Sequence, residues 1–241
     1  MEQQDDALVL TALPHGEHGA VVRFLTRASG LVAAYVHGAR SRRRRADLAP
    51  GNRVRLAWRA RREDQLPTAT VEPLASRALL AFHPATAAAL AYLVQLLAGA
   101  LAEGEACPEL YLGFDVLLDR MAADGEWQTA MVRFERDLLS GLGFGLDLAG
   151  CALTGRATDL GFVSPSSGRA VARAAVAGQP WAARLLPLPA FLADDGAAAT
   201  PADIRAGLAL TGHFLARHLF VDLPRAAALR AEAVARMTAS R

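Results

Sequence analysis

The strongest constraint on the fold lies at residues 53–61, where apolar and basic side chains alternate. The even positions hold apolar residues, namely Val54, Leu56, Trp58 and Ala60. The odd positions hold Arg53, Arg55, Ala57, Arg59 and Arg61. A period of two is expected for a β-strand that has one packed face and one face in water. The pattern therefore predicts a strand whose wet face is basic.

Four further segments before residue 77 have the composition of short strands separated by turns. They are residues 7–13, 20–26, 31–38 and 66–74, and the loops between them are rich in glycine, proline and serine. Five strands with no helix of any length, in about 75 residues, are typical of a small closed barrel, most often the oligonucleotide-binding (OB) fold. The sequence therefore predicts an OB-fold domain over residues 1–77.

From residue 78 onward the pattern becomes helical. We expect helices over residues 84–102, 108–122, 126–143, 179–186 and 201–220, and a frayed, at best helical end over residues 224–241. Residues 145–177 are rich in glycine, serine and threonine and are expected to be irregular. The predicted fold class is α+β: the five-stranded OB-fold barrel, then a mostly α-helical domain over residues 78–241 with this irregular insert.

Residues 78–102 carry no formal charge over a length that could span a bilayer. His83-Pro84, Gln95 and Gly99 interrupt the segment, and its larger residues fall on one helical face. This favours a buried bundle helix. The chain has two cysteines and an acidic N-terminal sequence unlike a secretion signal, so a cytoplasmic protein without a membrane partner is expected.

The common catalytic motifs are missing. All 26 basic residues are arginine, so a phosphate-loop lysine and a Schiff-base lysine are excluded. The sequence GLGFG at 141–145 closes a predicted helix, and Ser164, Ser166 and Ser167 lack the G-x-S-x-G context. We therefore expect no catalytic residue, no enzymatic activity and no cofactor.

Metal ligands are also sparse. His15 and His18 lie in a glycine loop without a third ligand nearby, and His213 and His218 have a five-residue spacing that separates them around a helix. Glu2, Asp5 and Asp6 lie near an end expected to be mobile, which weakens the case for a metal-dependent nuclease. No metal site is predicted.

Ten arginines between residues 40 and 62 face a single acid, Asp47. A nucleic-acid surface, a membrane patch and an ordinary solvated face are the alternatives. Only Leu48 could anchor residues 39–49 in a membrane, and the arginines are not interleaved with acids, so phosphates are the favoured partner. We predict a mobile phosphate-binding loop and a basic strand face, with one possible base-stacking residue. The candidates are Arg40, Arg42, Arg43, Arg44 and Arg45 on the loop, Arg53, Arg55, Arg59 and Arg61 on the strand, and Tyr35 for stacking, with a place in the core as the alternative for Tyr35.

The order of these elements resembles the RecO family of bacterial recombination mediators. The carrying residues are LVLTALPHGEHGAVVRFLTRASGLVAAYVHGARSRRRR at the start, then RFERDLLSGLGFGLDLAGCALTG and LGFVSPSSGRAV in mid-chain. The resemblance covers most of the chain. It implies an OB-fold, a helical domain and an intervening segment that holds zinc through four cysteines in some members. This chain has only Cys151 at the first ligand position and Thr154 at the second, so it resembles a metal-free member.

The resemblance also implies a function and partners. Family members bind single- and double-stranded DNA, anneal complementary strands, act on DNA coated by single-stranded-DNA-binding protein, and work with RecR to load recombinase at the nucleoid. The alternative is a structural or regulatory duplex-DNA-binding protein without annealing activity. For the C-terminal tail of the coating protein, Arg133 and Arg136 beside Phe134 are candidate contacts. Surface ion pairs to Glu135 or Asp137 are the alternative role for these two arginines.

Overall fold

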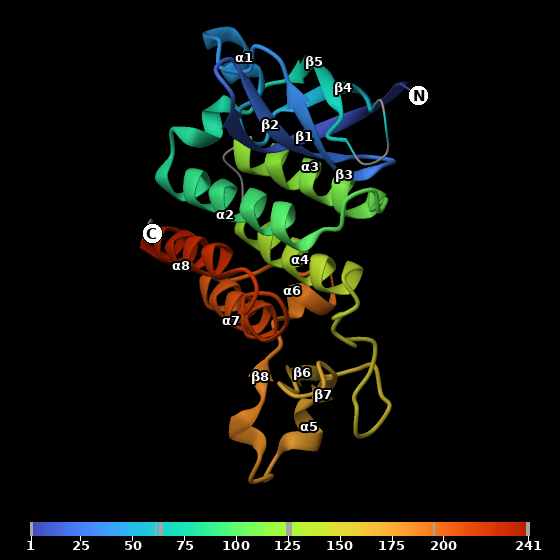
Figure 1. Ribbon diagram of the computed structural model, residues 1–241. Helices are drawn as coiled ribbons and strands as arrows, with labels where there is room; N and C mark the ends of the chain where they lie inside the picture. The colour runs from blue at the N-terminus through green and yellow to red at the C-terminus, as the bar shows by residue number, and fades with distance from the viewer. Residues whose placement is uncertain (1, 61, 63–64, 124–126, 195, 240–241) are drawn as a thin grey trace. The chain divides into compact units, whose positions relative to one another are not determined.

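The computed structural model describes residues 2–60, 62, 65–123, 127–194 and 196–239. The chain forms two compact units, the first from residues 1–125 with 223–241 and the second from residues 126–222. The second unit is thus inserted between two parts of the first. Figure 1 shows the barrel of the first unit in blue to cyan.

Five strands of the first unit form a closed barrel in the order β1-β2-β3-β5-β4. Their bounds are β1 Glu2–His15, β2 Gly19–Thr26, β3 Gly30–Val36, β4 Arg53–Arg59 and β5 Thr68–Ala75. All neighbours are antiparallel except β3 and β5, which run parallel. This is the predicted OB-like barrel, and the α+β class is confirmed.

The alternation in β4 is confirmed as well. Val54, Leu56 and Trp58 point into a core that also holds Phe24 of β2 and Val71 of β5. The intervening residues of β4 are exposed or half-buried. Burying these large apolar side chains stabilises the barrel by about 1.5–3 kcal/mol each, so the core sets which way the odd-numbered arginines point.

The prediction of a mobile arginine loop, with no helix before residue 77, is wrong. Residues Arg42–Asp47 form the short helix α1. Ser41 is its N-cap and accepts the backbone N–H of Arg44, and Leu48 at its C-cap is buried. A cap of this kind satisfies a backbone donor that a six-residue helix cannot pair internally.

The rest of the first unit is helical. It consists of η1 Ala78–Ala81, α2 Pro84–Ala100, α3 Pro108–Ala122 and α8 Pro224–Ala239. The prediction of a frayed C-terminal end is wrong for α8, because this helix packs along α2 and buries Ala226, Ala233 and Met237 (Figure 1). Across the described ranges, no helix combines the length and hydropathy that crossing a bilayer requires.

The second unit contains α4 Trp127–Gly141 and α7 Pro201–His218, with a small sheet between them in sequence. Its strands are β6 Leu160–Val163, β7 Ala170–Ala172 and β8 Leu186–Pro187, in the order β7-β6-β8. The unit is completed by α5 Arg173–Val176, η2 Ala182–Arg184 and α6 Ala190–Ala193.

Two predictions for this unit are wrong. The segment expected to be irregular over residues 145–177 contains β6, β7 and α5. The helix expected over residues 179–186 is only the three-residue η2 followed by β8, which pairs with β6. The strands of this sheet have two to four residues, too few for a hydrophobic period to be visible in the sequence.

Candidate nucleic-acid interface

Helix α1 presents three arginines to solvent. Arg42, Arg43 and Arg45 are exposed, and none of their side chains has a hydrogen bond or ion pair with any residue that the structure describes. We call these three residues the α1 face. Three unpaired cations on one short helix favour the binding of a polyanion, because their mutual repulsion is relieved by phosphate.

Arg44, on the other side of α1, fixes the helix to the barrel. Its Nη1 atom donates to the carbonyl of Val71 in β5 at 2.8 Å and lies 3.7 Å from Oδ2 of Asp47. Arg40, just before the helix, donates from Nη1 to the carbonyl of Glu17 at 3.0 Å. Arg40 and Arg44 therefore hold the segment in place, and the α1 face is built on an anchored element.

The strand arginines of β4 divide into paired and unpaired groups. Arg53 donates to Oδ2 of Asp115 in α3 at 3.2 Å, and Arg55 donates to Oδ1 of Asp6 in β1 at 2.7 Å. Burial lowers the pKa of Arg53, but the charge and hydrogen bond of Asp115 outweigh it and raise that pKa further above its ordinary value. The interpretation that these arginines lack acids around them is therefore wrong for Arg53 and Arg55.

Arg59 keeps its charge available. Its side chain is exposed and has no hydrogen bond or ion pair with the described part of the chain, although Glu2 stands opposite it in the register of β1 and β4. Glu2 and Asp6 belong to β1, so the expectation of a mobile end there is wrong. Arg61 lies outside the described residues.

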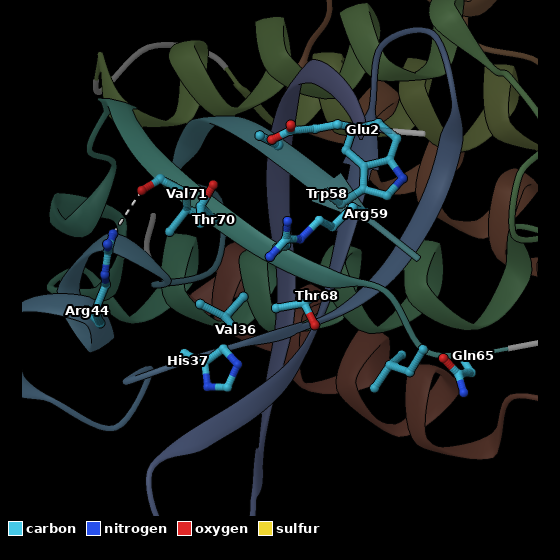
Figure 2. Close-up of a pocket in the computed structure, with 13 residues that line it drawn as sticks. Glu2, Val36, His37, Arg44, Trp58, Arg59, Gln65, Thr68, Thr70 and Val71 are labelled. Carbon is cyan, nitrogen blue, oxygen red and sulfur yellow. Dashed lines mark hydrogen bonds between the residues drawn. The ribbon is translucent and has the colours of Figure 1, made fainter. Parts of the chain in front are cut away.

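A groove of about 770 Å³ runs along the barrel beside α1 (Figure 2). We call it the barrel groove. Arg44 reaches it from α1, with its bond to the Val71 carbonyl drawn in the figure, and Arg59 reaches it from β4. The residues that line it are Glu2, Val36, His37, Arg44, Ala57, Trp58, Arg59, Gln65, Leu66, Thr68, Ala69, Thr70 and Val71.

Tyr35 stands in a row of three aromatic rings at the end of β3. Its ring centroid lies 4.7 Å from that of His37 and 5.9 Å from that of His15, both edge to face. Edge-to-face rings attract one another, so this row is held together. His37 also lines the barrel groove, which connects the predicted stacking residue to the groove.

The predicted partner-binding arginines of the second unit contact α6. Arg133 of α4 donates from Nε to the Phe191 carbonyl at 3.0 Å, and Arg136 donates from Nη1 to the Leu192 carbonyl at 2.7 Å. Arg136 also pairs with Asp137 at 2.8 Å. Both side chains therefore support the packing of α6.

Cys151 is buried in the insert. Burial raises the pKa of its thiol, but hydrogen bonds from the Thr154 hydroxyl and from the backbone of Ala172, Leu153 and Thr154 outweigh burial and lower the pKa to about 7. Among the described residues, no three histidine, cysteine or acidic side chains gather as metal ligands would.

The structure thus brings Arg44 and Arg59 to one groove, places Tyr35 beside the lining residue His37, and leaves Arg53 and Arg55 in ion pairs. Sequence reasoning missed His37, Gln65, Thr68 and Thr70 as lining residues. Residues of β5 and the end of β3 meet through the parallel pairing of Tyr35 with Thr68 and Val36 with Ala69. No local pattern signals that pairing.

Comparison with known proteins agrees with this architecture. The family described as "Recombination protein O N terminal" matches residues 1–77, which contain the barrel, and "Recombination protein O C terminal" matches residues 82–226. The chain is 46% identical over 226 residues to the DNA repair protein RecO of Phenylobacterium zucineum, covering 93% of this chain and 92% of that protein. It is 45% identical over 246 residues to the DNA repair protein RecO of Paracoccus denitrificans, covering 100% of this chain and 98% of that protein. With both halves matched and this identity sustained along its length, the chain belongs to the RecO family of DNA repair proteins.

Proposed function

We propose that this protein binds single- and double-stranded DNA through phosphates and anneals complementary strands as a recombination mediator. The observation that carries the proposal is the α1 face, three exposed arginines without acidic partners on a helix anchored to an OB-like barrel. The names of the curated relatives, which are DNA repair proteins, support the same role.

The chemistry of arginine suits annealing. Two DNA strands repel each other through their phosphates, and pairing requires that this repulsion be neutralised while the bases stay free. Guanidinium groups bind phosphate oxygens with a planar fork of donors and do not read the base. The α1 face can therefore hold a DNA strand of any sequence, and the bases of that strand remain free to pair with a second strand.

The proposed protein partners follow from family membership. We expect the protein to work with RecR and to capture the acidic C-terminal tail of single-stranded-DNA-binding protein, so that recombinase is loaded on coated DNA. Arg133 and Arg136 remain the candidate tail contacts. Titration of a tail peptide against an Arg133→Ala, Arg136→Ala double variant tests them, with a melting temperature to monitor the α6 contacts that the same change removes.

The central experiment is a strand-annealing assay, with and without the coating protein, on an Arg42→Gln, Arg43→Gln, Arg45→Gln variant. Glutamine keeps helix propensity and removes charge. Loss of three phosphate contacts should reduce the log-log salt slope of single-strand binding by about 2 and slow annealing at least tenfold. Arg44 is left intact because it anchors α1.

A matched control removes the same charge from the second unit. The side chains of Arg156, Arg184 and Arg205 are exposed and have no hydrogen bond or ion pair with the described residues, so their triple glutamine variant should retain the slope and the annealing rate. If both variants lost the same salt slope and annealing rate, net charge alone would explain the effect of the α1-face substitutions. Binding to duplex without any annealing would favour the structural or regulatory alternative.

A further inference from the structure

Helix α1 needs support from outside itself, because a helix of six residues is unstable alone. Ser41 caps its N-terminal end, and Arg44 bonds to the barrel from the middle of the helix. At the C-terminal end, the last carbonyls of a helix have no partner within it, so they need a donor from elsewhere. The α1 face can keep a fixed arrangement only if that end of the helix is held as well.

Asn52 supplies this donor. Its Nδ2 atom donates to the carbonyl of Ala46 at 2.8 Å and to the carbonyl of Asp47 at 3.1 Å, and these are the last two residues of α1. Asn52 is 3% exposed and directly precedes β4. Its own carbonyl accepts the backbone N–H of Val9 in β1 at 2.9 Å. The amide of Asn52 therefore ties the end of α1 to a rigid part of the barrel.

Arg77 fixes the direction in which this amide faces. The backbone N–H of Arg77 donates to Oδ1 of Asn52 at 2.8 Å, and Nη1 of Arg77 donates to the carbonyl of Gly51 at 3.1 Å. The Asn52 side chain thus meets two acceptors on α1 and one donor at residue 77. Asparagine, with one oxygen acceptor and two N–H donors, matches all three groups. A carboxylate of the same shape would accept from Arg77 but would repel the two carbonyls of α1.

We propose that Asn52 is a positioning residue for DNA binding, which holds the C-terminal end of α1 so that the α1 face has its arrangement before DNA arrives. This inference rests on the proposed DNA-binding function and assigns to it a buried residue that does not itself touch DNA. Without the amide, α1 has to be ordered on binding, and that ordering costs affinity. The number of cations that reach phosphates stays the same, so the salt slope is retained.

Two substitutions remove the contact in different ways. Asn52→Ala removes the donors and the acceptor without changing charge, whereas Asn52→Asp keeps the shape of the side chain and the acceptor for Arg77. Each should weaken single-strand binding about fivefold, measured by fluorescence anisotropy. The salt slope of Asn52→Ala should stay within about 0.5 of the parent value, although the α1-face glutamine variant loses about 2.

Thr26→Val is the matched control for a loss of barrel stability. Thr26 is fully buried in β2, and its hydroxyl donates to the Gly30 carbonyl at 2.8 Å and accepts the Ser29 N–H at 3.0 Å. These bonds lie in the turn between β2 and β3. Thr26→Val should therefore lower the melting temperature, as the Asn52 variants do, but retain the DNA affinity of the parent.

Hydrogen exchange followed by NMR reports on α1 without DNA. The N–H of Arg45 donates to the Ser41 carbonyl and that of Leu48 donates to the Arg44 carbonyl, both at 2.9 Å. In both Asn52 variants these two amides should exchange at least about tenfold faster than in the parent, because the end of the helix opens locally. In Thr26→Val they should exchange at the parent rate.

A double-mutant cycle tests whether Asn52 acts through the α1 face. Asn52→Ala should cost no further affinity in the α1-face glutamine variant, because the arginines that it positions are already absent. An equal loss in both backgrounds would overturn the inference, as would parent-like affinity and exchange in both Asn52 variants or an equal affinity loss in Thr26→Val. If the α1-face variant binds DNA as the parent does, the proposed function fails, whereas unchanged exchange of the α1 amides is a failure of this inference alone.

Discussion

Arg55 donates from Nε to Oδ1 of Asp6 across 2.7 Å, although 49 residues separate them in the chain. The contact follows from the antiparallel register of β1 and β4, which sets Asp6 opposite Arg55. Residues 53–61 contain no acid, yet the charge of Arg55 is neutralised by Asp6 of the neighbouring strand β1.

The first prediction releases that cation. Asp6→Asn removes the acceptor charge, so Arg55 becomes available to phosphate and single-strand affinity should rise about two- to fivefold, with a salt slope steeper by about 0.7. The loss of a partly exposed ion pair should cost at most about 1 kcal/mol of stability. Binding isotherms at four salt concentrations measure the slope.

Glu109→Gln is the control for Asp6→Asn. Glu109 is exposed at the start of α3 and its carboxylate has no partner among the described residues, so the substitution changes net charge equally without freeing an arginine. An identical change of slope in both variants would show that Arg55 gains no phosphate contact.

The second prediction concerns the buried ion pair between Arg77 and α3. The Arg77 side chain is 4% exposed and contacts Asp115, which is 13% exposed, and Asp119, which is 67% exposed. Asp115→Ala removes the buried partner and should lower the free energy of unfolding by about 3 kcal/mol. Asp119→Ala should cost about 1 kcal/mol because water still reaches that site.

Urea unfolding of the two variants distinguishes their roles. Asp115 also accepts from Arg53, so its removal leaves Arg53 without its carboxylate and Arg77 with Asp119 as its acidic partner. Equal losses for Asp115→Ala and Asp119→Ala would contradict the assignment of Asp115 as the principal partner.

The third prediction follows from the depressed pKa of Cys151. A thiol whose pKa is about 7 in the folded chain and 9.0 in its ordinary state binds fewer protons when folded, so stability rises with pH between those values. The contribution is full above pH 9 and is lost as the pH falls through 7. The melting temperature should therefore fall on acidification across this window, and Cys151→Ser should flatten the profile.

Thr154→Val provides a second measurement of the same effect. It removes the hydroxyl that helps to lower the thiol pKa, so the thiolate absorbance in a Cys107→Ser background should appear at higher pH than in the parent. A titration midpoint that does not move would exclude Thr154 as a stabiliser of the thiolate.

The fourth prediction tests the aromatic row. A Cβ at Gly19 would overlap the ring and hydroxyl of Tyr35, so Gly19→Ala should displace that ring from between His15 and His37. If Tyr35 stacks on a base, Gly19→Ala and Tyr35→Leu should each weaken single-strand binding about tenfold, and Tyr35→Phe should not. If Tyr35→Leu binds single strands with unchanged affinity, the aromatic row has a structural role only and Tyr35 does not stack on a base.

Part of the fold was predictable because its signals are local. The alternation of β4 and the long apolar stripes of α3, α4 and α7 each repeat over several residues, so a period is visible. Helix α1 has six residues, none of them buried. It depends on the Ser41 cap and on the hydrogen bond from Arg44 to the carbonyl of Val71 in β5, 27 residues further along the chain. Helices this short are unstable alone, so no local pattern predicts them.

The sequence by itself determined that a basic strand face and a cluster of arginines would stand on a small β-barrel, because side-chain direction along a strand follows from a period of two. Only the tertiary structure decided which cations remain available. Asp6 and Asp115 neutralise Arg55 and Arg53, whereas Arg42, Arg43, Arg45 and Arg59 have no such partner in the described chain. The physical reason is that an ion pair depends on the distance between charges in space, and strand register and helix packing set that distance independently of separation along the chain.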